Sequence, residues 1–327
     1  LPDWVLAELS KESISYEEIK EDFKVLKNPN CNQGESLEDF HHLFKSRYFK
    51  LLKILNSNFK KINEVDIKEK GIKRVVGLLM EKEIRRNKAR IVLDDLNSSI
   101  TLLALEDKAV NAASELLLDQ LVIAEFEVSK NGSFIAKNFY HPDLEYRVSN
   151  FSSKEVYVIL TSDLHIGSKA FLWEAFKRFL AWLKSNDYVA KKVKYLIFAG
   201  DIVDGVGVYP QQEKELETLD LREQFSKAIL LLKEIPRYIR VIIIPGNHDP
   251  VRQALPQPPL PKTYVKDLYN MENVTLLGNP SMVSLHGVKV LIYHGQSLYD
   301  VVASIPNSSF SKPAKAMKYL LKARHLA

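Results

Sequence analysis

Aspartate, histidine and asparagine residues follow four short apolar stretches in the second half of the chain. In chain order these residues are Asp163 and His165, Asp201 and Asp204, Asn247, His248 and Asp249, and finally His294. Carboxylate, imidazole and amide donors without a thiolate suit manganese, iron or zinc rather than a structural zinc or an all-oxygen calcium site. The residue types therefore indicate a site for divalent metal.

Asp201 lies between the histidine-bearing loops, which suits a carboxylate that bridges a pair of metal ions. Two ions roughly 3.5 to 4 Å apart polarise and neutralise a phosphoryl group. The chemistry predicted from this donor set is metal-assisted hydrolysis of a phosphoester. Asp204 and Asp249, each taken alone, also suit a turn or capping role.

Buried strands must position these residues. The apolar stretches predict strands at 156–160, 195–199, 240–245 and 290–293, and amphipathic stretches between them predict helices at 171–185 and 221–235. This alternation is typical of an α/β layered domain. Because ligands bind beyond the carboxyl ends of strands in open α/β sheets, we expect the four loops to converge on one crevice. Trp173 and Trp182 fall on the apolar side of the first helix and are predicted to be core residues.

The region before this domain has a different pattern. Short strands are predicted at 73–80, 89–94, 98–105, 120–128 and 133–139, with a helix at 107–118 between the third and fourth strands. Five strands with a helix in that place predict a small all-β barrel of the OB-fold type. A leading helix is expected at 36–56, with Ser36 as its cap.

Composition limits the function classes. The net charge of +5 comes from 46 basic and 41 acidic residues, so a polyanionic partner is permitted and not required. Residues 60–95 hold a local excess of four basic residues, which suits either a solvated surface or contact with nucleic acid. The single cysteine, Cys31, excludes an intrachain disulfide framework, and no apolar run is long enough to span a bilayer. We expect a soluble cytoplasmic protein.

The motifs DxH, GDxxD, GNHD and a later HG, each after an apolar strand, resemble those of the calcineurin-like metallophosphoesterase superfamily over about 150–295. The stretches VDGVGVYPQQ at 203–212 and GNHDPVRQALPQPPLPK at 246–262 are similar to the small subunits of archaeal family-D DNA polymerases, relatives of the B-subunits of eukaryotic replicative polymerases. The resemblance implies a 3′–5′ exonuclease that proofreads for a large polymerase subunit. We expect two divalent metals, with manganese first and iron, zinc or magnesium as alternatives, and single-stranded or frayed 3′ ends as the DNA substrate. A sliding clamp is a further candidate partner.

The resemblance also implies a role for each residue of the site. Asp163 and His165 are expected on the first metal and Asp201 as the bridge, with Asn247 and His294 on the second metal. His248 is expected beside the scissile phosphate as a catalytic residue that stabilises charge or protonates the leaving 3′ oxygen. Asp204 and Asp249 are expected behind these ligands, with Asp249 orienting His248.

The predicted domains are an appendage or linker at 1–35, with one or two short helices within 1–27, an OB-fold domain at 36–148 and a phosphoesterase domain at 149–327. The superfamily's GHxH loop, which gives two more histidine ligands, is absent from this sequence. His325 lies in the basic stretch KYLLKARHLA and does not fit that loop. We therefore expect a fragment whose phosphoesterase domain is incomplete and whose site binds metal poorly.

Two other functions are compatible with these patterns. The chain could act as a non-catalytic scaffold that docks the polymerase large subunit, with a vestigial metal site. It could also be another phosphoesterase, such as a DNA-repair nuclease. The predicted barrel before the DxH strand argues against the second alternative, since such enzymes normally begin near that strand.

Overall fold

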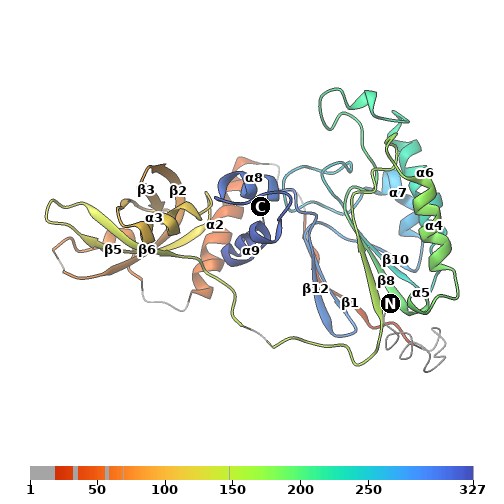
Figure 1. The fold of residues 1–327 in the computed structure, drawn as a ribbon, viewed down its shortest axis with the longest axis horizontal. Coiled ribbons are helices and arrows are strands. Elements are labelled where there is room, and N and C mark those ends of the chain that lie inside the picture. Colours follow the sequence, from red (N-terminus) through yellow and green to blue (C-terminus); the bar gives the residue numbers. More distant parts are fainter. Residues whose placement is uncertain (1–18, 32–35, 56–58, 69, 147, 327) are drawn as a thin grey trace. The chain divides into compact units, whose positions relative to one another are not determined.

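The computed structural model describes residues 19–31, 36–55, 59–68, 70–146 and 148–326 (Figure 1). These fall into two compact units, each built from two separate parts of the chain. Unit 1 contains residues 1–32 and 148–296, and unit 2 contains residues 33–147 and 297–327. Within the described part of the chain, no helix has the length and apolar character that a membrane span requires.

Unit 2 contains a closed five-stranded barrel. Its strands are β2 (Lys73–Arg85), β3 (Lys88–Asp94), β4 (Ser99–Ala104), β5 (Leu121–Val128) and β6 (Phe134–Tyr140). The order around the barrel is β2-β3-β4-β6-β5, with β4 and β6 parallel and the other pairs antiparallel. Helix α3 (Asp107–Ser114) lies between β4 and β5 in the chain, and its apolar side packs into the barrel core. The predicted barrel is confirmed, and its strand order and helix are OB-like.

Further helices accompany the barrel within unit 2. Helix α2 (Leu37–Ile54) begins at Ser36, whose hydroxyl accepts from the backbone N–H of Asp39 while the Asp39 carboxylate accepts from Ser36, as the sequence predicts for this cap. Helices α8 (Leu298–Ser304) and α9 (Ala314–Ala323) follow residue 296, and η2 (Ile62–Glu64) is a short 3₁₀ turn.

Helices α8 and α9 are fixed to the barrel by hydrogen bonds. Lys82 of β2 donates to the carbonyl of Ser304 at 3.3 Å, and Arg324 donates to the carbonyl of Asp143 at 2.6 Å. The predicted phosphoesterase range of 149–327 therefore differs from the structure, in which residues 297–327 belong to the same unit as the barrel.

Unit 1 is built around a parallel sheet. Its strands are β7 (Tyr157–Thr161), β8 (Val193–Ala199), β9 (Arg240–Ile244) and β10 (Val274–Leu276), in the order β10-β9-β8-β7. Helices α4 (Trp173–Leu183), α6 (Leu221–Lys233) and α7 (Lys262–Tyr269) cover one face (Figure 1), with α5 (Tyr188–Lys192) and η3 (Gln212–Lys214) in the connections. Trp173 and Trp182 are partly buried against this core, as predicted.

A second sheet covers the other face of the parallel sheet. It is antiparallel, in the order β1-β11-β12, with β1 at Phe23–Lys27, β11 at Ser281–Leu285 and β12 at Val288–Ile292. Tyr195 and Ile242 of the parallel sheet pack against Val283 and Leu285 of the antiparallel one. Unit 1 therefore has three layers, which are helices, a parallel sheet and an antiparallel sheet.

Two predictions are wrong in this region. The stretch at 290–293 does not continue the parallel sheet, because β12 pairs only with β11 among the described strands. The helices predicted within 1–27 are replaced at 23–27 by β1, and residues 1–18 lie outside the described part of the chain. Strand β1 is formed by its pairing with β11, more than 250 residues later in the chain, which a local pattern does not reveal.

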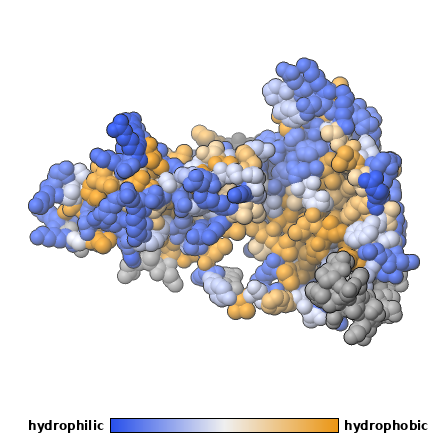
Figure 2. Space-filling model, viewed as in Figure 1, coloured by the Kyte–Doolittle hydropathy of each residue, from blue (hydrophilic) through white to orange (hydrophobic). Residues whose placement is uncertain are grey.

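Strand β7 is an edge strand rather than the buried strand expected from its apolar sequence. Its residues alternate in burial, and the side chain of Leu160 is 69% exposed. Figure 2 shows apolar surface gathered over the sheets of unit 1.

Candidate metal centre

The residues that follow β7 and β8 have unusual backbone conformations. Asp163, His165 and Asp201 all have φ between +51° and +54°, in the left-handed region that few side chains adopt. The two loops are held together by hydrogen bonds, from the Asp163 N–H to the carbonyl of Gly200 at 3.0 Å and from the His165 N–H to the carbonyl of Asp201 at 3.1 Å. Residues with such backbone conformations cluster at functional sites. Here the conformations direct three donor side chains toward the same point.

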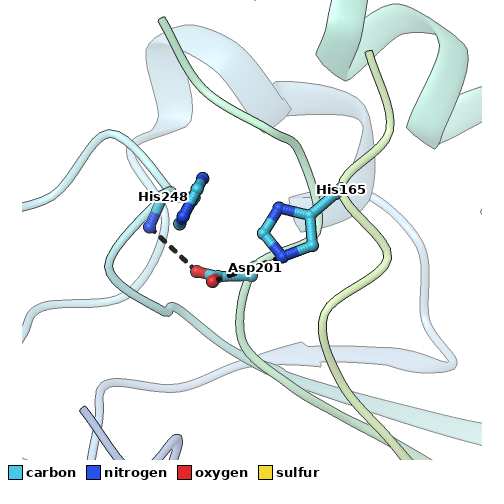
Figure 3. A group of neighbouring side chains, drawn as sticks. All are labelled: His165, Asp201 and His248. Carbon is cyan, nitrogen blue, oxygen red and sulfur yellow. Dashed lines mark hydrogen bonds and ion pairs between the residues drawn. The ribbon is translucent and has the colours of Figure 1, made fainter. Parts of the chain in front are cut away.

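Asp201 is the centre of the site and is almost fully buried. Its Oδ2 lies 3.8 Å from His165 Nε2 and 3.4 Å from His294 Nε2. Two groups of candidate ligands share this carboxylate, and in each group the donor atoms lie within 4.8 Å of one another. The groups are Asp163, Asp201 and His294, and His165, Asp201 and His248, the second of which is drawn in Figure 3.

His294 is oriented from both sides of its ring. Its Nδ1 lies 2.8 Å from the carbonyl oxygen of Ala199, which can only accept, so Nδ1 carries the hydrogen. The opposite atom, Nε2, faces Asn247 Oδ1 at 2.9 Å and Asp201 Oδ2 at 3.4 Å. Burial opposes the charge on this ring, but the hydrogen bond and charge of Asp201 outweigh it and raise the pKa of His294 to about 9. Asn247 and His294 therefore lie together, and their binding of one metal ion stays a prediction.

His165 and His248 lie side by side, with ring centroids 4.5 Å apart and planes nearly perpendicular. His248 donates its backbone N–H to Asp201 Oδ1 at 2.8 Å, and its Nδ1 donates to the carbonyl of Asp204 at 2.7 Å. His165 Nε2 lies 3.7 Å from Asp163 Oδ1, and this interaction lowers the pKa of Asp163 and raises the pKa of His165. Because Nδ1 of His248 is held by the carbonyl of Asp204, Nε2 is the ring nitrogen that remains available to a ligand or substrate.

Asp249 does not orient His248, and that predicted role is wrong. The Asp249 side chain is 2% exposed, and its Oδ2 accepts from the backbone N–H groups of Gly246 and Asp201, both at 2.9 Å. Burial raises its pKa to about 6. Asp249 thus fixes the turn that carries Asn247 and His248 to the loop of Asp201. The group that orients the His248 ring is the carbonyl of Asp204.

The donor set fits a divalent cation. His294 Nε2 faces two acceptor oxygens, an arrangement that either a proton or a cation satisfies. His165 Nδ1 is buried without a hydrogen bond, although Asp204 Oδ1 lies 2.9 Å away in an unsuitable direction. Carboxylates, imidazoles and an amide oxygen are together the ligands that manganese, iron or zinc prefer.

A pocket of about 330 Å³ opens beside this centre. Its lining residues include Asp163, His165, Ser168, Phe171, Asp204, Tyr209, Glu215 and His248. The sequence prediction did not include Tyr209, whose ring centroid lies 6.0 Å from that of His248 and whose hydroxyl donates to Glu215 at 2.8 Å. The only feature of the sequence that points to Tyr209 is its position within the stretch 203–212, which follows the loop of Asp201 and precedes the loop of His248 in the chain.

Three buried glutamines that the sequence prediction missed hold the loops of the site. Gln212 Nε2 donates to Asp204, both to its carbonyl at 2.8 Å and to its Oδ2 at 3.0 Å. Gln224 bonds both backbone groups of Gly205, and Gln257 donates to the carbonyl of Gly246 at 3.2 Å. Nothing in the sequence separates such glutamines from exposed ones, because their partners lie 8 to 19 residues away, in other loops.

The donor-bearing strand ends, together with a family model, define the class of protein. Residues 158–327 match the family model that describes the B-subunits of DNA polymerases alpha and epsilon, and this range includes every predicted ligand. Comparison with individual proteins is more specific. The chain belongs to the family of archaeal DNA polymerase II small subunits, as the motifs led us to expect.

Three relatives with that name illustrate the similarity. The protein of Pyrococcus furiosus is 39% identical over 342 residues, which cover 96% of this chain and 56% of the relative. The proteins of Thermoplasma acidophilum and Archaeoglobus fulgidus are 37% and 40% identical and cover 96% and 95% of this chain, in each case over 65% of the relative. The chain thus spans between about half and two thirds of the length of these relatives.

Among solved structures, a chain of a replication protein A heterotrimer bound to ssDNA is similar to part of this chain, with 16% identity and a TM-score of 0.19. The match covers 26% of this chain and 71% of the other. The barrel of unit 2 is defined by its own strand pairing, not by this likeness.

Proposed function

We propose that this chain is the small subunit of a replicative DNA polymerase and carries a 3′–5′ exonuclease that proofreads by two-metal phosphodiester hydrolysis. The observation that carries the proposal is the pair of ligand groups that share Asp201. A shared carboxylate between two such groups is the arrangement that a two-metal phosphoesterase requires. The assignment of unit 1 as a metallophosphoesterase domain is part of this proposal.

Asp163, His165, Asn247 and His294 would hold the two divalent cations, with Asp201 shared between them. The structure groups Asp163 with His294 and His165 with His248 around Asp201, which differs from the pairing that the resemblance implies. Manganese fits this mixture best, with iron, zinc and magnesium as alternatives. Bound there, two cations supply neutralisation and polarisation of the phosphoryl group.

The remaining chemistry belongs to His248. Its Nδ1 hydrogen is held by the carbonyl of Asp204, so Nε2 is the atom that would take up a proton from solvent and, from the imidazolium form, give it to the leaving 3′ oxygen. The pocket beside the centre, with Tyr209 on its wall, gives room for a terminal nucleotide.

The name of the related proteins indicates which binding partners this chain would have. A small subunit implies a large polymerase subunit, and proofreading implies single-stranded or frayed 3′ ends of DNA as the substrate. The barrel of unit 2 is a second surface on which either partner can dock.

The test is cleavage of 3′-labelled and 5′-labelled single-stranded oligonucleotides with Mn²⁺. It compares this chain with a form extended by a segment that bears a GHxH loop, since the ligand set is expected to be short of two histidines. We expect cleavage from the 3′ end, reduced roughly 100-fold or more by Asp201→Asn and substantially by His248→Ala. Asp107→Asn, at an exposed aspartate of unit 2, is the matched control.

Cleavage that survives Asp201→Asn would refute the metal centre. Unchanged cleavage by His248→Ala would refute the role given to His248 alone. Absence of cleavage from both forms, with Mn²⁺ binding also absent, would favour a scaffold subunit.

A further inference from the structure

One short segment of this chain, residues 297–327, carries a large excess of positive charge. Residues 297–327 contain five basic residues and one acidic residue, and so carry +4 of the net charge of +5. The other 296 residues are almost balanced in total, although residues 60–95 hold a further local excess of four basic residues. A local excess of this size on a short segment is a polyanion-binding signal that the overall composition conceals.

The lysines of this segment differ in whether their ammonium groups have hydrogen-bond or ion-pair partners. Lys315 donates to the carbonyl of Pro306 at 2.6 Å, and Lys322 lies 3.8 Å from an Asp143 carboxylate oxygen. Lys312 and Lys318 are exposed, and neither has an ion pair with any residue in the described part of the chain. Lys315, Lys318 and Lys322 are spaced three and four residues apart, which places them along one side of α9.

Two exposed aromatic rings belong to the same segment. Tyr299 of α8 is 67% exposed and Phe310 is 60% exposed, and their ring centroids lie 5.0 Å apart. Single exposed apolar residues are common, but a pair of large rings held together in solvent is not. Lys312 follows Phe310 by two residues, and α8 packs on α9 (Figure 1), so the two rings and the lysines belong to one pair of packed helices and the loop that joins them.

Rings and unpaired lysines together have the chemistry of a single-strand platform. Bases stack on aromatic rings without regard to sequence, and lysines follow the phosphates. An acidic protein partner would use the lysines but would gain little from two neighbouring, solvent-facing rings. Tyr299 also follows His294 of the metal centre by only five residues in the sequence.

We propose that Tyr299, Phe310, Lys312 and Lys318 form a binding platform for single-stranded DNA, on which bases stack on the two rings and phosphates pair with the two lysines. The choice of DNA among polyanions rests on the proposed function. The existence of the platform does not, because the charge and the rings are features of unit 2.

The experiment measures anisotropy of a fluorescein-labelled oligothymidylate with EDTA present, so that cleavage does not contribute. The Tyr299→Ala/Phe310→Ala variant is expected to bind at least tenfold more weakly, by about the loss of one to two stacked bases. The Lys312→Ala/Lys318→Ala variant is expected to lower the salt-dependence slope of binding by about 1.4, because each phosphate contact on a single strand contributes about 0.7.

Exposed residues elsewhere serve as matched controls. Phe151→Ala removes an exposed ring from unit 1, and Lys50→Ala/Lys53→Ala removes two exposed lysines from α2. Neither is expected to change affinity by more than about twofold. All the substituted positions are exposed, and circular dichroism verifies that each variant is folded.

Unchanged affinity in the ring variant would overturn the platform, as would displacement of the oligothymidylate by polyglutamate at equal charge concentration, which would indicate an acidic protein partner. The two proposals also fail separately. Ring-dependent binding without cleavage would retain the platform and reject the nuclease, whereas Asp201-dependent cleavage with ring-independent binding would do the reverse.

Discussion

Of the two aspartates expected behind the ligands, Asp204 and not Asp249 contacts the histidine rings. Asp204 contacts both histidines of one ligand group, through its Oδ1 to His165 and its carbonyl to His248. Asp249 instead accepts hydrogen bonds from backbone groups of three loop residues. The motif GNHD therefore contains two functional residues and one that builds the loop that carries them.

Removing the Asp249 carboxylate should affect stability before chemistry. In Asp249→Ala the buried N–H groups of Gly246 and Asp201 lose their acceptor, which costs roughly 2–4 kcal/mol of the free energy of unfolding. Urea unfolding followed by the fluorescence of Trp173 and Trp182, both in unit 1, measures this loss. Asp204→Ala, which removes no acceptor from a backbone N–H group in the described hydrogen bonds, is the matched comparison and should lose less stability. Equal losses would contradict the loop-building role.

The sequence predicted the candidate ligands because each stands directly after a strand, in a short motif. It did not predict which oxygen contacts which nitrogen, because Asp204 and Asp249 each end a motif and the sequence does not show which loop each of them faces. Tyr209 and the buried glutamines were missed for a related reason. Their partners lie in other loops, and their own neighbours in sequence carry no pattern.

At the scale of elements, the sequence predicted helices and strands that have local signals, and it did not predict pairing between distant segments. Helix α2 begins at the cap formed by Ser36 and Asp39, and the barrel strands match the predicted segments that are bounded by turn residues. Four of the five residues of strand β1 are exposed and the fifth is half-buried, so β1 has no buried face that an alternating pattern could mark. Its pairing with β11 makes it a strand. The division into two discontinuous units was hidden in the same way.

The end of β8 depends on a glycine that has no alternative. Gly200 has φ of +98°, and a Cβ built there would lie 2.5 Å from His294 Nδ1 and 2.8 Å from the Gly246 backbone. Gly200→Ala should therefore displace His294 and the following loop, with a loss of roughly 2–4 kcal/mol in unit 1.

Gly207 is a control that distinguishes the steric clash at Gly200 from the backbone strain of a positive φ. It also has a positive φ, +74°, but a Cβ there meets nothing within 4 Å. Gly207→Ala should cost only about 1 kcal/mol, which reflects the conformation alone. The measurement is urea unfolding by tryptophan fluorescence, together with Mn²⁺ binding. Similar losses from the two variants would show that the close approach to His294 is not what requires glycine at 200.

At the scale of the whole molecule, the chain passes from unit 1 to unit 2 and back, and its last segment joins the barrel unit. His325 shows how closely that segment is fitted. Arg47 of α2 donates to His325 Nε2 at 2.5 Å, which requires a neutral ring because arginine has no acceptor. Burial and the charge of Arg47 lower the pKa of His325 to about 4.

This pairing makes unit 2 sensitive to acid. An unfolded histidine titrates near pH ~6.5, so between about pH 6.5 and 4 the unfolded chain binds a proton that the folded chain does not. The stability that neutral His325 allows is complete above that window and is lost as the pH falls through it. Between about pH 7.5 and 5 the loss from this one group should be about 2 kcal/mol.

His325→Gln keeps an acceptor for Arg47 and removes the titration. Urea unfolding followed by circular dichroism, with tryptophan fluorescence to identify the transition of unit 1, should therefore show a smaller pH dependence of unit 2 in this variant. His141, whose pKa burial also lowers, is unchanged in both proteins and cancels in the comparison. His41→Gln, at an exposed histidine of α2, is the control and should behave as the parent chain. If His325→Gln and the parent chain lose equal stability in acid, His325 is not neutral in the folded state, and residues 297–327 are joined to the barrel by other contacts.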